Sequence, residues 1–509
     1  MRCDQDDMPR FAIVTCRTTT NRADPEPLPR TDVALALSVA VMVGAVLMWA
    51  AGDLFPTMEY RDWLAWSDNF SLFNTLQKMI VRDAWFSREF SMAAVQLSSN
   101  VCGISLPCLN AFVLLPVTLA APLLFVLARL LGVSRAVSVA GVALWLLSWP
   151  TMDALAWHAT IHDRWALAFV LAALCLALHF YPRIRSLRQD IPLGAAGLVL
   201  VWLACNSKEA AWFLAPTLAL VAWAAVAGDW QLRLRNTRVV WPSLVYTVWH
   251  ALSFAHAAKT EGAAWLQHVA SGDVPNNLQQ FAGHLLSLTP SNGATIKMLV
   301  ILLSIVFVDV RMRPARAFPL WPVLLGFVAA VAIAARSVAS APYYMMIPLA
   351  LFSVLLLATV QRALAAQNLR RAGAWLRELV PISLAAVMIT VFLNGKFSQY
   401  REFRKQSRNF QSVVQLIAGL PSANLREPPY FLHHPAAVRA PYLLFTAEWR
   451  SLWRLIPGTD VLPKPTWLNQ SVRWTYAWGP IAHPPNDGRT YIYMGPRLEL
   501  TAVESALVR

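Results

Sequence analysis

Residues 109–131 read LNAFVLLPVTLAAPLLFVLARLL, an apolar run whose only charged residue is Arg129. A helix needs about 20 apolar residues to cross the ~30 Å hydrocarbon core of a bilayer, so this run predicts a transmembrane helix. The whole chain has the same character, because 57% of its 509 residues are apolar and only 14% are charged. Soluble domains carry roughly 25% charged residues. The composition therefore excludes an ordinary soluble enzyme and predicts a membrane protein.

Similar apolar runs occur along most of the chain. Together with residues 109–131 they predict about eleven transmembrane helices, which form one bundle over residues 31–394. The fold class that we expect is therefore mainly α, as a polytopic membrane protein. The other ten runs lie near residues 31–51, 136–150, 164–181, 191–206, 209–227, 239–258, 296–310, 317–335, 342–361 and 379–394.

Basic residues distinguish the two sides of this bundle. The side that includes the polar tail at residues 1–30 collects 20 Lys and Arg residues, whereas the loops of the other side hold nine before residue 395. Loops rich in Lys and Arg stay in the cytoplasm. The sequence therefore predicts a disordered cytoplasmic tail and a multi-pass protein of the bacterial inner membrane, in contact with membrane lipids. The net charge of +15 then follows mostly from the basic residues of the cytoplasmic side, and we expect no nucleic-acid partner.

Residues 395–509 have a different composition from the rest of the chain. They contain Pro-rich turns, such as the one that follows Glu427, and a strand-like Thr-Tyr-Ile-Tyr segment that begins at Thr490. We expect a small domain of mixed α and β character here. The predicted topology places this domain on the outer, periplasmic face.

Two of the six cysteines, Cys102 and Cys108, fall in the first long outer loop. In an oxidising compartment such a pair can close a small disulfide, and both the bridged and the reduced states stay open at this point. Cys175 and Cys205 lie within predicted helices, where a thiol behaves as a small apolar residue. No cysteine spacing is typical of a metal-binding finger.

Ionisable residues near membrane depth are candidate functional groups, because they are costly to keep there. Several fall in three outer loops, and together they offer a carboxylate base and a cation for a phosphate at one mouth of the bundle. The simpler alternative is that they only cap helices or pair with one another. These residues are Asp53, Glu59, Asp62 and Asp68 in the first loop, Asp153 and Asp163 in the second, and Lys208 and Glu209 in the third.

Three segments carry a resemblance to a known family. They are LSWPTMDALAWHATIHDRWALA at residues 147–168, LACNSKEAAWFLAP at 203–216 and YYMMIP at 343–348. In their order and their place on the predicted helices they resemble membrane glycosyltransferases of the GT-C class. The branch they resemble is related to the transmembrane O-mannosyltransferases with tetratricopeptide repeats, although no repeat array follows here. The sequence departs from the family pattern at Arg61, which stands where the family has an acid, and at Trp149, which replaces a His.

The resemblance implies a GT-C-like bundle and a reaction. A sugar, hexosyl or pentosyl, would pass from a polyprenyl-phosphate donor to a hydroxyl of a glycan, lipid or protein of the cell envelope on the outer face. One carboxylate takes the acceptor proton in such a transfer. The resemblance implies Asp62 for this role, with Glu59 and Asp53 as substitutes and Asp153 as a second acid. Asp153 has an alternative role as a helix cap.

The same resemblance implies the residues that bind substrate. Lys208 is the candidate ligand of the departing phosphate, and Arg164 could add a second contact. Glu209, Asp163 and Tyr344 complete the set. The alternatives are an internal ion pair of Lys208 with Glu209 or Asp163, and a purely structural role for Arg164.

A metal site and other function classes are weaker possibilities. His158 and His162 have an i, i+4 spacing that would place them on one helix face, where they either hold a metal or line the acceptor pocket. We expect no required metal, and no cofactor beyond the lipid-linked donor. The competing functions are a lipid-linked sugar transporter or flippase, a glycan ligase, and a catalytically degenerate GT-C homologue, the last suggested by Arg61. A transporter often has paired repeats, and none is evident in this sequence.

Overall fold

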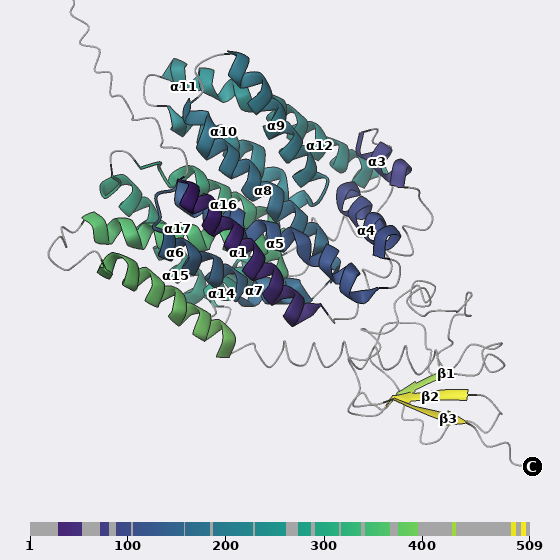
Figure 1. Ribbon diagram of the computed structural model, residues 1–509. Coiled ribbons are helices and arrows are strands. Elements are labelled where there is room, and N and C mark those ends of the chain that lie inside the picture. The colour runs from purple at the N-terminus through teal and green to yellow at the C-terminus, as the bar shows by residue number, and fades with distance from the viewer. Residues whose placement is uncertain are drawn as a thin grey trace, which may run out of the picture.

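The computed structural model describes most of the predicted bundle and three short strands. It describes residues 29–52, 72–80, 88–102, 105–156, 158–183, 187–226, 230–260, 273–286, 291–314, 317–336, 342–366, 375–394, 430–433, 490–494 and 500–504. In these ranges the chain is mainly helical (Figure 1). Asp53, Glu59, Asp62 and Asp68 of the first predicted outer loop lie outside the described residues.

The helices follow one another with short connections. The α-helices are α1 (Arg30–Ala51), α3 (Leu72–Ile80), α4 (Glu89–Cys102), α5 (Leu106–Leu130), α6 (Arg135–Leu146), α7 (Trp149–Ala156), α8 (Ile161–Phe180), α9 (Leu187–Cys205), α10 (Leu214–Ala225), α11 (Trp230–Thr237), α12 (Trp241–Thr260), α14 (Val274–Leu286), α15 (Asn292–Arg311), α16 (Trp321–Ala334), α17 (Met346–Ala366) and a last helix, Trp375–Asn394. Short 3₁₀ turns join some of them: η1 (His158–Thr160), η2 (Tyr181–Arg183), η3 (Glu209–Phe213), η4 (Arg238–Val240) and η5 (Pro342–Met345).

Six of the described helices are long and apolar enough to cross a membrane. They are α1, α5 from Pro107, α8, α15, η5 with α17, and the last helix. The pair α6 and α7 makes a seventh if it is counted as one span, although it is bent by 58°. The bend follows from Pro150, because proline has no backbone N–H with which to continue the hydrogen bonds of α6.

The other four predicted spans also form helices, but crossing a membrane stays a prediction for them. The helical segments Gln189–Cys205, Glu209–Ala225 and Trp321–Ala334 have only 10–17 residues. α12 is long enough but does not pass as a span, because its polar residues lower its hydropathy. A helix therefore lies near each of the predicted positions, but six or seven of the described helices are long and apolar enough to span a membrane, and the count of eleven spans stays a prediction.

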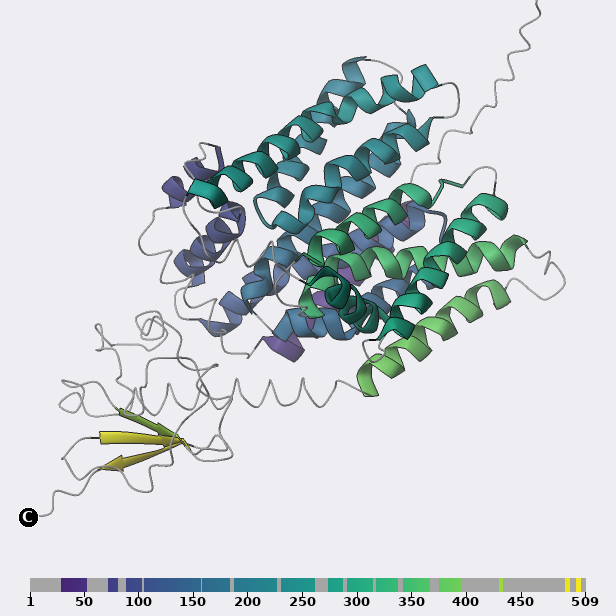
Figure 2. The same ribbon diagram turned by 180° about the vertical axis from the view of Figure 1, so that it is seen from behind.

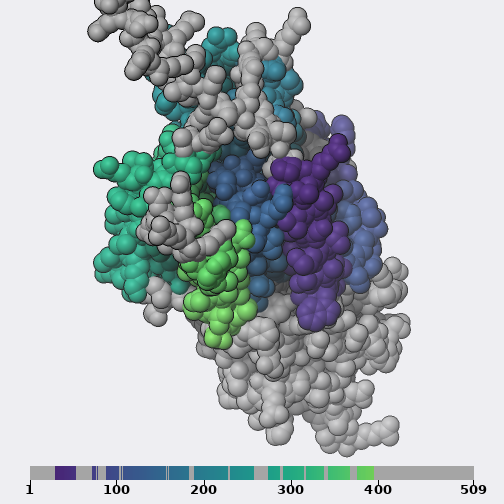
Figure 3. Space-filling model, turned by 60° about the vertical axis from the view of Figure 1, so that its left-hand side comes forward, coloured from purple at the N-terminus to yellow at the C-terminus, as the bar shows by residue number. Residues whose placement is uncertain are grey.

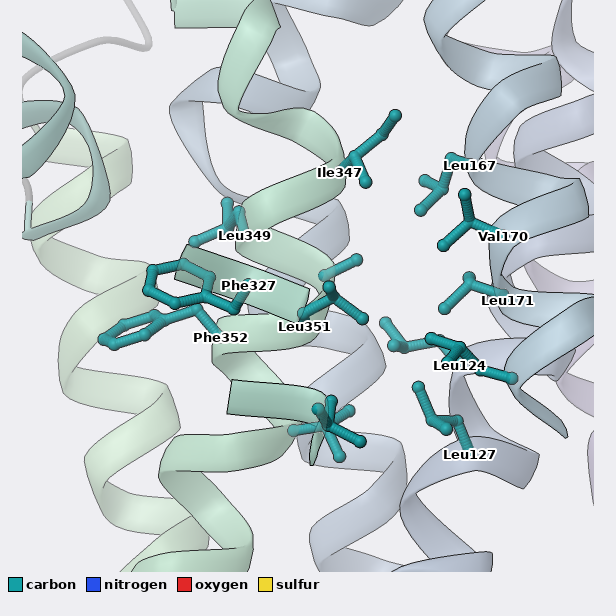
Figure 4. Packing of buried hydrophobic residues seen from close by; sticks show 14 of the residues in the cluster. Leu124, Leu127, Leu167, Val170, Leu171, Phe327, Ile347, Leu349, Leu351 and Phe352 are labelled. Carbon is teal, nitrogen blue, oxygen red and sulfur yellow. The ribbon is translucent and has the colours of Figure 1, made fainter. Parts of the chain in front are cut away.

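Helices α8 and α17 lie at the centre of the bundle. The apolar stretch of each of these two spans is 78% buried, whereas that of α1 is 22% buried and that of the last helix is 17% buried. Figure 4 shows Leu167 and Leu171 of α8 facing Ile347 and Leu351 of α17, with Leu124 of α5 below them. In Figure 3, α1 (purple) and the last helix (light green) lie at the surface. Both expose apolar side chains there, which is the side-chain pattern of helices that face lipid.

The bundle has two sides with α5, α8 and α17 between them. Helices α9, α10 and α12 form one side, and α15 and the last helix form the other (Figures 1 and 2). This arrangement places residues from distant parts of the sequence next to one another. The candidate site is formed by such residues.

Ion pairs with buried carboxylates hold the end of the bundle where α1 begins. The carboxylate of Asp32 accepts hydrogen bonds from Arg129 Nε at 2.9 Å and from Arg135 Nε at 2.5 Å. Arg362 Nη1 lies 2.7 Å from Asp309 Oδ1, and both side chains are nearly fully buried. Arg238 also pairs with Asp190. Four Arg residues that we assigned to the cytoplasmic side thus also tie helices together.

The three strands form one small sheet in the order β1-β2-β3. β1 (Tyr430–His433) is parallel to β2 (Thr490–Met494), and β2 is antiparallel to β3 (Leu500–Glu504). The strand predicted to begin at Thr490 is confirmed. The boundaries of the predicted domain at residues 395–509 stay a prediction.

Candidate functional site

A polar turn between α9 and η3 presents Lys208 and Glu209. Asn206 Nδ2 donates to Trp202 O at 2.8 Å and Ser207 Oγ donates to Leu203 O at 2.8 Å, so both side chains bond to the last turn of the helix that they end. Short polar side chains favour such local bonds over continuing a helix. Lys208 then takes an extended backbone conformation, and η3 starts at Glu209.

The Lys208 ammonium is buried among two carboxylates and an aromatic ring. Its Nζ lies 3.8 Å from Asp163 Oδ2, 3.5 Å from Glu209 Oε1 and 5.2 Å from the centre of the Tyr344 ring. Burial opposes the charge, but the two carboxylates outweigh it and raise the pKa of Lys208. The structure thus brings together four predicted substrate-binding residues that come from α8, from the turn before η3 and from η5. The internal ion pairs named as the alternative for Lys208 are also present.

Arg88 is a second cation of this cluster, and it was not among the site residues predicted from the sequence. Its Nη2 lies 2.9 Å from Glu209 Oε1 and its Nε lies 3.3 Å from Oε2, which is a two-point contact with one carboxylate. Burial acts against the charge, but Glu209 raises the pKa of Arg88. The partners are 121 residues apart in sequence. The only signal that pointed to Arg88 was its place among the few cations of the predicted outer face.

The start of α4 fixes the position of Arg88. Phe90 N donates to Asn206 O at 3.1 Å and Ser91 Oγ donates to Ser207 O at 3.4 Å, so the helix is bonded to the same turn that carries Lys208. The Phe90 ring also packs edge-on against Trp165 of α8, with ring centres 5.4 Å apart. These contacts join α4, α8 and the α9–η3 turn around the cluster.

Helix α4 is also held at its other end. Cys102 and Cys108 form a disulfide with their Cα atoms 5.4 Å apart, which joins the end of α4 to the beginning of α5. Of the two states that the sequence left open, the structure contains the bridged one. The helix that positions Arg88 is therefore tied to α5 by a covalent bond.

Arg164 has a structural role in the bundle. Its side chain is fully buried, and its guanidinium donates to Val113 O at 2.9 Å, to Ala154 O at 2.5 Å and to Leu155 O at 3.2 Å. Arg164 Nε adds a bond to Thr160 Oγ1 at 3.2 Å. These bonds tie α8 to α5 and to the end of α7, as in the structural alternative. We therefore do not retain Arg164 as a phosphate ligand.

Asp153 lies inside α7 and not before it. The helix begins at Trp149, and its first turn is bonded by Ser148 Oγ, which accepts from Thr151 N at 3.4 Å. The expectation that Asp153 could cap this helix is therefore wrong. α7 packs against η5, the turn that carries Tyr344. Asp153 stays a candidate second acid on a helix that adjoins the cluster.

His158 belongs to a polar chain that reaches the start of the first outer loop. Asn110 Nδ2 donates to Gly52 O at 2.8 Å, so Asn110 Oδ1, at 2.7 Å from His158 Nε2, accepts a hydrogen bond from that ring nitrogen. Burial and the nearby Arg164 lower the pKa of His158 to about 3, which keeps the ring neutral. This chain fixes Gly52, the last described residue before the loop that contains Asp62 and Glu59.

His158 and His162 do not have the arrangement that we expected for a metal site. His158 lies in η1, whereas His162 lies in α8, which begins only at Ile161. The shared helix face expected from the i, i+4 spacing is therefore wrong. Among the residues that the structure describes, no group of three His, Cys, Asp or Glu side chains could hold a metal ion.

Comparisons with known proteins give distant structural likenesses. No protein-family model matches the sequence, and no curated protein matches it either. The structure is similar to the archaeal oligosaccharyltransferase AglB from Archaeoglobus fulgidus, solved with an inhibitory peptide and a dolichol-phosphate, with a TM-score of 0.43 and 12% identity over 84% of this chain. The chain spans 64% of the length of AglB. It is also similar to apo ArnT from Cupriavidus metallidurans, with a TM-score of 0.43 and 15% identity over 79% of this chain and 82% of ArnT. Likenesses of this strength do not decide the function.

Proposed function

We propose that the protein is a GT-C-type membrane glycosyltransferase. It transfers a hexosyl or pentosyl group from a polyprenyl-phosphate donor to a hydroxyl of a cell-envelope glycan, lipid or protein. The reaction takes place on the outer face of the bacterial inner membrane. The proposal rests on one observation above others, which is the buried Lys208 ammonium held beside Asp163, Glu209 and Tyr344.

A buried lysine between apolar helices suits a lipid phosphate. An ammonium acts as a compact point charge, and at low dielectric it stabilises the negative charge that develops on a departing phosphate. The apolar surroundings suit the polyprenyl chain on the same ligand. Lys208 thus stabilises the departing phosphate, and its raised pKa keeps it charged at neutral pH.

The other half of the reaction needs a base. As the sugar leaves the phosphate, one carboxylate takes the proton of the acceptor hydroxyl. We assign this role to Asp62 from its match to the family motif, with Glu59 as a substitute and Asp153 to orient the acceptor or the base. Asn110 donates to Gly52 and accepts from His158, and these hydrogen bonds support the assignment because they fix the start of that loop beside η1.

Two variants and a control test the proposal. The native protein, Asp62→Asn, Lys208→Ala and Lys297→Ala are purified and given radiolabelled polyprenyl-phosphate hexose or pentose with a cell-envelope extract. We expect transfer by the native protein and by Lys297→Ala, which removes an exposed lysine. Both site variants should lose about a hundredfold or more in rate, the usual scale of a lost acid–base or charge-stabilising group. Full transfer by both would refute the site, and no transfer by the native protein with either donor class would refute the function.

A further inference from the structure

The Lys208 cluster is electrically balanced before any ligand is present. Arg88 and Lys208 supply two positive charges, and Asp163 and Glu209 supply two negative charges, joined by contacts of 2.9 to 3.8 Å. A phosphate that arrived at this cluster would add negative charge, and both cations of the four residues are already paired. One of the two carboxylates must therefore give up its place for the phosphate to be held.

The two carboxylates differ in exposure. The Asp163 side chain is 5% exposed, whereas that of Glu209 is 25% exposed. Glu209 makes the shorter contacts, at 2.9 Å from Arg88 and 3.5 Å from Lys208, against 3.8 Å between Asp163 and Lys208. Its side chain nevertheless reaches the surface, so it can turn outward when another anion takes over its contacts with the two cations. Glu209 is the carboxylate that can leave.

Glu209 also occupies the place that a phosphate oxygen would take. Its Oε1 atom lies 2.9 Å from Arg88 Nη2 and 3.5 Å from Lys208 Nζ, so one oxygen faces both cations. A guanidinium binds carboxylate and phosphate by the same two-point geometry. The site that Arg88 and Lys208 form together is thus filled by a side chain with the charge and the oxygen spacing of the ligand.

Arg88 cannot move away as easily as Glu209. The neighbouring Phe90 and Ser91 are bonded to the carbonyls of Asn206 and Ser207, and the disulfide holds the far end of α4. The carboxylate is therefore the mobile partner and the guanidinium is the fixed one. An exchange of anions at this place needs no movement of a helix.

We propose that Glu209 is a resident counter-ion that the phosphate of the lipid donor displaces from Arg88, so that Arg88 becomes a second phosphate ligand beside Lys208. This inference rests on the proposed function. It adds a specific residue to the proposed function and explains how the buried Lys208 and the half-buried Arg88 are kept in place without a donor. Glu209 then competes with the ligand and sets its affinity.

Binding without sugar transfer tests the inference. The protein in nanodiscs is titrated with polyprenyl phosphate and, separately, with the uncharged polyprenol, and inorganic phosphate is added as a competitor. The variants are Arg88→Gln, Arg88→Lys and Glu209→Gln. The charge-matched controls are Lys297→Gln and Glu378→Gln, at exposed positions away from the cluster.

The expected result is opposite for the two partners of the ion pair. Glu209→Gln should tighten polyprenyl phosphate binding about threefold or more, because the competing charge is gone. Arg88→Gln should weaken it about tenfold, the scale of one charge-assisted hydrogen bond, and Arg88→Lys should fall between Arg88→Gln and the native protein. Polyprenol binding should not change in any of them. Competition by millimolar inorganic phosphate would assign the site to free phosphate, which overturns the part of the inference that concerns the lipid.

Unchanged or weaker phosphate binding by Glu209→Gln would overturn the exchange, as would native affinity in Arg88→Gln. If Glu209→Gln does not fold, the two Arg88 variants decide, because only a ligand role separates phosphate from polyprenol binding. Failure of the native protein to bind polyprenyl phosphate would instead count against the proposed function. The two failures are therefore distinguishable.

Discussion

Arg164 is a fully buried charged group with a structural role. Its guanidinium bonds three backbone carbonyls from two other segments of the chain. Loss of the side chain would leave these carbonyls buried without the hydrogen bonds that the arginine supplies. Each such group costs about 1–3 kcal/mol.

We therefore expect Arg164→Ala to lower the free energy of unfolding by about 3–5 kcal/mol, and Arg164→Lys to recover only part of it because lysine lacks the planar fork. Thermal unfolding in detergent measures this. A phosphate-binding role would give the reverse pattern, in which Arg164→Lys is as stable as the native protein but binds polyprenyl phosphate weakly.

His158 provides a pH dependence whose sign follows from its lowered pKa. The unfolded residue has a pKa near 6.5 and the folded one near 3, so between these values the unfolded state binds more protons. The contribution of the neutral His158 ring to the free energy of unfolding is fully present above pH 6.5. It is lost as the pH falls toward 3, by up to about 1.4 kcal/mol per pH unit.

Melting temperatures measured between pH 7 and 4.5 check this prediction. The native protein should lose more stability over this range than His158→Gln, whose side chain does not titrate. His256→Gln, at an exposed position, is the control and should follow the native curve. Identical slopes for the native protein and His158→Gln would count against the assignment.

Prediction from sequence succeeded for some residues of the site and not for others. Lys208 and Glu209 interrupt apolar runs, and that local contrast marked them. Arg88 carries no such mark, because its role depends on a contact with a residue 121 positions away. Arg164 was considered as a phosphate ligand because the motif gives the residue type. The motif does not show the backbone carbonyls around the side chain.

At the scale of the element, helix α4 connects the cluster to the rest of the bundle. Arg88 precedes it and the disulfide follows it. Apolar runs predicted most helices but not the division of residues 136–150, where α6 ends at Leu146 and α7 begins at Trp149, just before Pro150. It also could not tell a bridged from a reduced pair at Cys102 and Cys108, since that depends on how α4 and α5 meet.

We expect the Cys102→Ser, Cys108→Ser double variant to lose about 2 kcal/mol of stability, the entropy of closing a loop of this size. Hydrogen exchange should rise along α4, and polyprenyl phosphate binding should weaken because Arg88 is held less firmly. A reductant should produce the same changes in the native protein and none in the variant. No change in exchange along α4 would contradict this role of the disulfide.

At the scale of the whole molecule, the chain has two chemically different ends. Arg129 and Arg135 pair with Asp32 where α5 ends and α6 begins, whereas Asn110 and His158 meet where α5 begins. Arg129 and Arg135 thus lie at the end of the bundle opposite to the candidate site. Composition and charge predicted a polytopic helical bundle, but they could not show that some of these arginines also bind helices to one another.

The predicted topology has a direct test in the two ends of α15. A membrane-impermeant maleimide should label Lys297→Cys in cells whose outer membrane is permeabilised, and should label Arg313→Cys only after the inner membrane is opened. Both positions are exposed on the molecule. The opposite labelling pattern would invert the orientation and place the site on the cytoplasmic face.

The most direct measurement of the central claim is an experimental structure of the protein in nanodiscs with polyprenyl phosphate bound. We expect the phosphate to contact Lys208 Nζ and Arg88, with Glu209 turned away toward solvent and the lipid chain along the apolar helices. A phosphate bound elsewhere, with Lys208 still between Asp163 and Glu209, would contradict the claim.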